Sequence, residues 1–319
     1  MLFIKYLLGS IFICFLLTQI SYFSDFFFII WGVLLLLGAL TLTRYQLLAL
    51  FAISLAIIIN SFDFSIAFYY VCLSLAVFVM SMHLTAKSNY ETVRQKGIIT
   101  AVLAISFYLA SIFFMTGSIG EEAFQKELQA SFQSYIPFYE QHGVFDQLAT
   151  EGVSREDMEN DLQSLAITIS KFLPSVFYLQ ALFTVFFMVL IASNLSKRVP
   201  EHAWERKPYY LEIMPWQLVW LVIAALALWL WGRYGQPLAG QIGSNLIVIM
   251  LPIAVYFGFS AISWRIKALK PKARIWIAAT LIVIGVIILP SAIVFLALIG
   301  VFDALLDYRK LRSGKGDAI

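Results

Sequence analysis

The chain has 319 residues, of which 61% are hydrophobic, 16% aromatic and only 13% charged, and its mean hydropathy is +0.86. Soluble domains carry about 25% charged residues, so this composition excludes an ordinary water-soluble protein. The formal net charge is +3, and the only two cysteines lie inside apolar stretches, which leaves no basis for a disulfide framework or a zinc site built from cysteine pairs.

Four apolar windows open the chain, at residues 6–23, 26–43, 46–59 and 64–82, with short gaps between them. Each approaches the ~20 residues that cross a bilayer, and the short gaps predict antiparallel neighbours. The first window has no small-residue cleavage site after it and is therefore expected to stay as a span. Basic residues in 83–96 place that segment in the cytoplasm by the positive-inside rule, and the N-terminus with it.

A fifth window at 97–114 leads into a polar insertion at 116–164, which contains ten acidic and two basic residues. This excess of negative charge favours the extracytoplasmic side. Aromatic and apolar residues recur at helical spacing over 123–138, which predicts a helix there. Ser154 resembles a helix N-cap, and the helix that it starts is expected to continue without a break into the sixth span at 165–194.

The remaining spans are predicted at 216–231, 241–264 and 275–306, separated by a connector at 200–212 and a strongly basic loop at 265–274. The last window can form one long helix or two short ones broken at Pro290. Two short spans are preferred because they return the basic C-terminal residues to the cytoplasm. The fold class is therefore an all-α polytopic bundle of about eight to ten spans with an acidic, partly helical extracytoplasmic insertion.

The predicted organisation has four segments. They are N-terminal transmembrane helices at 1–117, the acidic insertion at 118–164, C-terminal transmembrane helices at 165–312, and a flexible tail at 313–319.

A catalytic constellation is not found in the sequence. The three histidines fall in three separate polar segments, and Ser313-Gly-Lys315 lacks the rest of a nucleotide-binding loop. We find no nucleophile paired with a base, so the sequence predicts a protein that is not an enzyme and that has no catalytic residues, metal or cofactor.

Polar side chains within the spans are the remaining signal for function. Such residues either hydrogen-bond neighbouring helices or face a ligand. The segment 241–252 contains glycine, asparagine and proline, which could loosen a helix and present its backbone to a substrate, as in transporters. The candidate ligand-binding residues are Lys171, Gln180, Gln241 and Asn245.

Charged residues near the basic ends form a second candidate set. Asp303 and Asp307 are four residues apart and share a helix face, where they could pair with nearby basic side chains and hold the C-terminal turn, or could dock a partner. The candidate partner-docking residues are Arg198, Arg206, Lys207, Arg265, Lys270, Asp303, Asp307 and Arg309.

Short motifs in the second half resemble those of the YybS-like family of bacterial multi-pass membrane proteins. They are Phe172-Leu-Pro-Ser175, Asn194 before a basic turn, Met214-Pro-Trp216, Gly300-Val-Phe-Asp303 and Asp307-Tyr-Arg-Lys310. That family is distantly similar to the substrate-binding S-components of energy-coupling-factor transporters. The resemblance implies a membrane-embedded binding module without its own ATPase, although the acidic insertion and the extra N-terminal spans depart from a six-helix S-component.

The leading hypothesis is a protein of the bacterial inner membrane that binds a small molecule or lipid, as the substrate-recognising part of a transport system. It would need a cytoplasmic or membrane protein partner and has no expected nucleic-acid partner. The alternative is a membrane interaction or assembly factor without transport activity.

Overall fold

The computed structural model describes residues 2–117, 121–141, 155–198 and 204–311, and all regular structure in these ranges is helical. Eight of the described helices are long and apolar enough to cross a membrane. The predicted all-α polytopic bundle is therefore confirmed. The helices group into two compact units, Met1–Arg206 (unit 1) and Lys207–Ile319 (unit 2).

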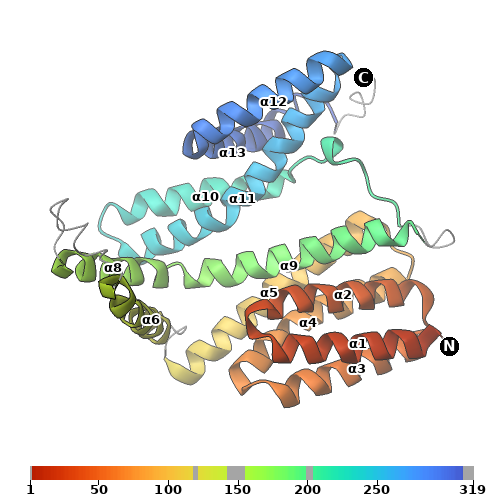
Figure 1. Ribbon diagram of the computed structural model, residues 1–319. Coiled ribbons are helices and arrows are strands. Elements are labelled where there is room, and N and C mark those ends of the chain that lie inside the picture. The colour runs from red at the N-terminus through yellow and green to blue at the C-terminus, as the bar shows by residue number, and fades with distance from the viewer. Residues whose placement is uncertain (1, 118–120, 142–154, 199–203, 312–319) are drawn as a thin grey trace. The chain divides into compact units, whose positions relative to one another are not determined.

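The described part of unit 1 contains six membrane-length helices and two helices of the acidic insertion. Figure 1 labels them in chain order. They are α1 (Leu2–Gln19), α2 (Ser24–Thr41), α3 (Arg44–Ser61), α4 (Phe64–Thr85), α5 (Tyr90–Thr116), α6 (Glu121–Gln141), α8 (Arg155–Ser170) and α9 (Leu173–Ser196). Helix α2 packs against α1, α4 and α9, and α5 packs against α4 and α9. Helix α9 therefore contacts the N-terminal helices, although the sequence analysis assigned it to the segment that begins at residue 165.

The core of unit 1 is dense and rich in aromatic rings. The ring of Phe28 lies 5.1 Å from those of both Trp31 and Tyr70, and all three side chains are buried. Gly32 and Gly97 lie so close to methionine side chains that an added Cβ would overlap them. The absence of a side chain at these glycines lets Met188 of α9 pack against the backbone of α2, and Met80 of α4 against that of α5.

Local signals explain where several of these helices begin and end. Thr43 and Gln46 form a reciprocal capping box at the start of α3, and the Asn89 side chain accepts a hydrogen bond from the backbone N–H of Thr92 at the start of α5. Gly117 ends α5 in the left-handed conformation at φ 76°. These side chains satisfy backbone groups that a helix end leaves unpaired.

The insertion differs from its prediction at one point. The helix expected over 123–138 is present as α6, but α8 does not continue into the sixth span. Lys171 and Phe172 form a turn, and α9 starts at Leu173 with Pro174 in its first turn. Proline lacks the N–H and clashes with the carbonyl four residues earlier, so the helix must restart there. The proposed N-cap, Ser154, lies outside the described residues.

Unit 2 is built around one long helix. Its elements are the short 3-10 helix η3 (Tyr209–Leu211), α10 (Trp216–Gly232), α11 (Pro237–Lys267), α12 (Pro271–Ile287) and α13 (Leu289–Leu306). Helix α11 packs closely against α10 and α13. Glycines mark these crossings, because a Cβ on Gly243 would overlap the backbone of Trp229, and one on Gly258 or Gly300 would overlap the carbonyl of Leu296 or Ala254. Pro252 lies within α11 without ending it.

The last apolar window forms two helices, as the sequence analysis preferred. Helix α12 ends at Ile287, and α13 begins at Leu289 with Pro290 in its first turn. Helix α12 has no buried residue, whereas α10, α11 and α13 each bury at least two. It is therefore the most loosely packed helix of unit 2.

Candidate ligand-binding site

The four predicted ligand-binding residues are divided between the two units. Lys171 is exposed in the turn before α9, and Gln180 lies on α9, both in unit 1. The Gln180 amide donates a hydrogen bond to the Asp25 carboxylate on α2, and the Tyr70 hydroxyl donates to the same carboxylate at 3.1 Å. Gln180 thus connects two helices. A role for Lys171 or Gln180 in ligand binding stays a prediction.

The other two predicted ligand-binding residues lie on α11 in unit 2. The Asn245 side-chain amide donates a hydrogen bond of 3.0 Å to the carbonyl of Gln241, one turn earlier on the same helix. Asn245 is buried and Gln241 is half-buried. Neither residue lines the groove described next, so their predicted roles also stay untested.

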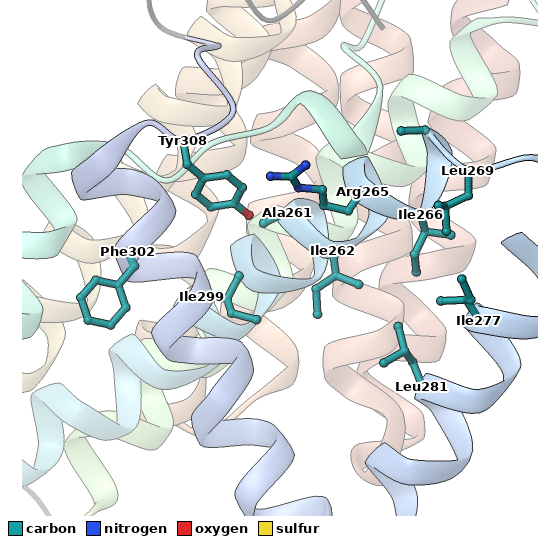
Figure 2. A pocket seen from close by; sticks show the side chains of 11 residues that line it. Ala261, Ile262, Arg265, Ile266, Leu269, Ile277, Leu281, Ile299, Phe302 and Tyr308 are labelled. Atoms are coloured by element: carbon teal, nitrogen blue, oxygen red, sulfur yellow. The ribbon is translucent and has the colours of Figure 1, made fainter. Parts of the chain in front are cut away.

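A groove opens between α11, α12 and α13, near the end of unit 2 where α11 finishes and α12 begins (Figure 2). Its cavity volume is about 590 Å³. It is lined by Ala261, Ile262, Arg265, Ile266, Ala268, Leu269, Ile277, Leu281, Ile299, Phe302 and Tyr308. Aliphatic and aromatic side chains therefore form almost the whole surface, and Arg265 is its one cationic side chain.

The turn between α11 and α12 is held by Arg274. Its guanidinium donates to the carbonyl of Lys267 at 2.7 Å and to that of Leu269 at 3.3 Å. These carbonyls belong to the end of α11, where backbone acceptors lack helical partners. Because Arg274 is in the first turn of α12, this contact sets where α12 leaves α11, and the groove lies between the two helices beyond it.

Arg265 lies at one end of the groove, next to two aromatic rings. Its guanidinium carbon is 5.1 Å from the ring centroid of Trp264 and 5.7 Å from that of Tyr308. Figure 2 shows the Arg265 and Tyr308 side chains at the same end of the groove. Among the described residues, none hydrogen-bonds or ion-pairs with Arg265. Its donors are therefore available to a ligand.

Tyr308 stays neutral at physiological pH. Burial, followed by the Asp303 carboxylate, raises the pKa of its phenol, and the opposing effects of Arg309 and Arg265 do not cancel that rise. A neutral phenol contributes a π face to Arg265 but no negative charge. The positive charge of Arg265 is therefore not neutralised by its aromatic neighbour.

Arg309, which follows the groove residue Tyr308 in the chain, forms a buried polar cluster that we call the Arg309 clasp. Its guanidinium pairs with Asp303, with an Nε–Oδ2 distance of 2.9 Å, and both residues are fully buried. It also donates to the carbonyls of Tyr210 and Glu212, each at 2.8 Å, and to the hydroxyl of Ser260 at 3.3 Å. The clasp therefore joins the connector, α11 and α13.

A second set of bonds ties the connector to α11. The Tyr256 hydroxyl donates to the Glu212 carboxylate at 2.8 Å, and the Tyr209 hydroxyl donates to the Tyr256 carbonyl at 2.6 Å. Helix α13 ends at Leu306, and its C-cap residue, Asp307, has a left-handed backbone at φ 44°. Together these contacts hold the turn that carries Tyr308 to the groove.

Sequence reasoning identified Asp303 and Arg309 but not the Arg309 partners Tyr210, Glu212 and Ser260. The interpretation that Asp303 pairs with a nearby basic residue agrees with the structure, where the two side chains are enclosed and not offered to a partner. The one local indication of the wider cluster was Glu212, a charged residue just before the apolar helix α10. The other contacts join residues far apart in the sequence, so no local pattern predicts them.

The other predicted docking residues have different surroundings. Arg198, Lys207 and Lys270 are exposed, and Asp307 is half-buried. Arg206 is also half-buried, with its guanidinium 5.8 Å from the ring centroid of Tyr90. Partner docking at these positions stays a prediction.

A metal site is not evident in the part of the chain that the structure describes, where no three His, Cys, Asp or Glu residues gather. Cys14 and Cys72 are buried and unpaired with each other. His142 and His202 lie outside the described residues.

Comparison with known proteins gives one match. A family model described as "Predicted membrane protein (DUF2232)" matches residues 8–304. Neither the curated proteins nor the solved structures include a significant match. The match covers both units, including α11, α12 and nearly all of α13.

Proposed function

We propose that this chain, which belongs to the DUF2232 family of predicted membrane proteins, is a non-enzymatic protein that binds a small amphiphile or lipid in the groove between α11, α12 and α13. The observation that carries the proposal is the lining of the groove, in which apolar side chains surround a volume of about 590 Å³ and one cation lies at the end. Ligand pockets of proteins typically measure about 300–1,000 Å³ and combine apolar walls with a few polar groups.

The packing of α12 supports entry from the bilayer. Ile277 and Leu281 of α12 form one wall, and α12 has no buried residue. A helix with so few interior contacts can shift at low cost, since its apolar surface remains covered by lipid tails whether or not it moves. An apolar molecule within the membrane can therefore reach the groove without crossing water.

The resemblance to S-components supports a role as the recognition part of a transport system in the bacterial inner membrane. In that role a separate ATPase supplies the energy. The exposed basic residues Arg198, Lys207 and Lys270 are suited to contact such a partner at the cytoplasmic face. Gentle purification from native membranes followed by mass spectrometry tests this extension, because a stoichiometric ATPase is expected to co-purify.

The binding function is tested by filling the groove. Leu281→Trp replaces an aliphatic side chain of the groove wall with a bulky indole ring. Ile282→Trp puts the same ring on the adjacent position of α12, where the Ile282 side chain is 67% exposed and outside the groove. The purified full chain is exposed to a lipid with a photoreactive acyl chain, and the labelled peptides are identified by mass spectrometry. Labelling of α11–α13 peptides is expected to fall severalfold in Leu281→Trp only.

Equal labelling of both variants and the unchanged protein would contradict the groove as the binding site. A cross-link from α12 to a second membrane protein, without lipid labelling in the groove, would instead favour the interaction or assembly factor. The exposed side chains of Trp276 and Ile287 on α12 give that alternative a surface.

A further inference from the structure

The apolar walls of the groove cannot by themselves select a ligand. For a molecule already in the bilayer, lipid tails are as apolar as leucine side chains, so moving a chain into the groove gains little from the hydrophobic effect. The selectivity must then come from shape and from polar groups. Arg265 is the one charged side chain in the lining, which makes it the residue that discriminates between head groups.

Arg265 is positioned for an anion. It carries five N–H donors in a planar fork that matches carboxylate and phosphate oxygens. Within the described ranges these donors have no protein acceptor, while the rings of Trp264 and Tyr308 hold the guanidinium at the groove end. Asp303, the buried carboxylate that acts on the neighbouring phenol of Tyr308, is already paired with Arg309.

The charged residues that follow Arg265 in the sequence, up to the start of α12, are also positive. The Lys267 ammonium lies 3.6 Å from the ring centroid of Tyr210, and Lys270 is exposed two residues before Lys272 at the start of α12. These residues and Arg265 lie at the end of α11 and the beginning of α12. Clustered basic residues at a membrane surface attract anionic lipids, by about 1 kcal/mol for each basic residue near the surface.

We propose that the ligand of this groove is a membrane lipid with a net negative head group, whose phosphate pairs with the Arg265 guanidinium while an acyl chain lies between α11, α12 and α13. This inference rests on the proposed binding function and adds the class of ligand. It assigns the head group to Arg265 and the chain to the apolar wall that includes Ile277, Leu281 and Ile299.

The test is a competition between two lipids. The full chain in nanodiscs is given phosphatidylglycerol and phosphatidylethanolamine with identical acyl chains and the same photoreactive group, and groove labelling is measured for each. Both lipids carry a phosphate that can pair with Arg265, but only phosphatidylethanolamine has an ammonium group, which cancels its net charge and is repelled by the guanidinium. At about 1 kcal/mol for one basic residue near the membrane surface, we expect about a fivefold preference for the anionic lipid. Arg265→Gln is expected to abolish that preference, and Arg265→Lys to retain part of it because the charge stays but the fork is lost.

Arg44→Gln is the matched control, since Arg44 is an exposed arginine at the start of α3 in unit 1, outside the groove, and the preference is expected to remain. Salt dependence of the unchanged protein gives a second readout that needs no variant, because an anionic preference should weaken at high ionic strength.

Each outcome separates the two proposals. Equal labelling by both lipids in the unchanged protein, with Leu281→Trp still reducing it, would overturn the anionic head group and keep the binding groove. No effect of Leu281→Trp would overturn the groove and therefore the head-group assignment as well. Displacement of the anionic lipid by inorganic phosphate at millimolar concentration would show that a soluble anion is the ligand, which also overturns the lipid.

Discussion

Units 1 and 2 use polar side chains differently. In the described part of unit 1, polar contacts between helices are hydrogen bonds without an ion pair. Ser10 bonds Ser54 and Ser106 bonds Tyr178, each with an oxygen–oxygen distance of 2.7 Å, and the Asp25 carboxylate accepts from neutral donors. Unit 2 instead encloses a full ion pair, Asp303 with Arg309, beside a helix that has no buried residue. Separating a buried ion pair leaves uncompensated charges, so we expect Asp303 and Arg309 to favour the one arrangement of segments that keeps them together.

The two units also differ in how tightly their helices are packed. Unit 1 has a core rich in buried aromatic side chains, whereas α12 of unit 2 buries no residue. We therefore expect α12 to shift more easily than the segments that the Arg309 clasp joins. Three changes test the contrast, and they are arranged from the largest expected effect to the smallest.

Arg309→Met should have the largest effect. It leaves the Asp303 carboxylate buried without a counter-charge and removes the donors to the carbonyls of Tyr210 and Glu212. Removing one member of a buried pair costs about 3–5 kcal/mol. Thermal unfolding of the full chain in detergent measures the loss, and the exposed neighbour provides the control Lys310→Met. If both variants unfold alike, the clasp does not stabilise unit 2.

Replacing a glycine at a close helix crossing should have an intermediate effect. A Cβ in Gly300→Ala would overlap the carbonyl of Ala254 on α11, and backbone cannot move aside as a flexible side chain can. Overpacking of this kind costs about 1–3 kcal/mol. The same measurement of unfolding applies.

The matched control for that change lies on α12. Gly285 has open space around its Cβ position, so Gly285→Ala should stabilise the helix by roughly 0.5–1 kcal/mol through lower backbone entropy. A loss of stability in Gly285→Ala equal to that of Gly300→Ala would mean that α12 is as tightly packed as α13.

The smallest effect is expected in unit 1. Ser54→Ala removes the bond between the Ser10 and Ser54 hydroxyls that joins α1 to α3. Hydrogen bonds between membrane helices average only about 0.6 kcal/mol, because the polar group finds other partners when the helices separate. A double-mutant cycle with Ser10→Ala measures the coupling, and a value above that of the Arg309 clasp would reverse the comparison.

Much of the fold follows from local sequence. The apolar windows predicted the membrane helices, and Pro290 predicted the division of the last window, because proline acts through its own backbone. Pro174 likewise starts a new helix, and the prediction of an unbroken helix through that position was wrong. Because proline acts on its own backbone, the sequence alone could have predicted this break.

The candidate site was much less predictable. Lys171, Gln180, Gln241 and Asn245 were chosen because polar residues are costly in a membrane, yet Gln180 and Asn245 can meet that cost with hydrogen bonds to Asp25 and to the Gln241 backbone. The groove is lined almost wholly by aliphatic residues, which are common to every span. Nothing in their sequence pattern distinguishes a groove wall from a lipid-facing surface.

The sequence by itself determined that this is an all-α membrane protein and where most of its helices lie. It also determined which segments between the helices are basic. These properties depend on composition and on neighbours within one or two helical turns. Only the tertiary structure decided that Arg265 stands at an apolar groove and that Arg309 reaches the carbonyls of Tyr210 and Glu212, 99 and 97 residues earlier. The physical reason is that packing between helices brings distant residues together, and neither periodicity nor hydropathy records which faces meet.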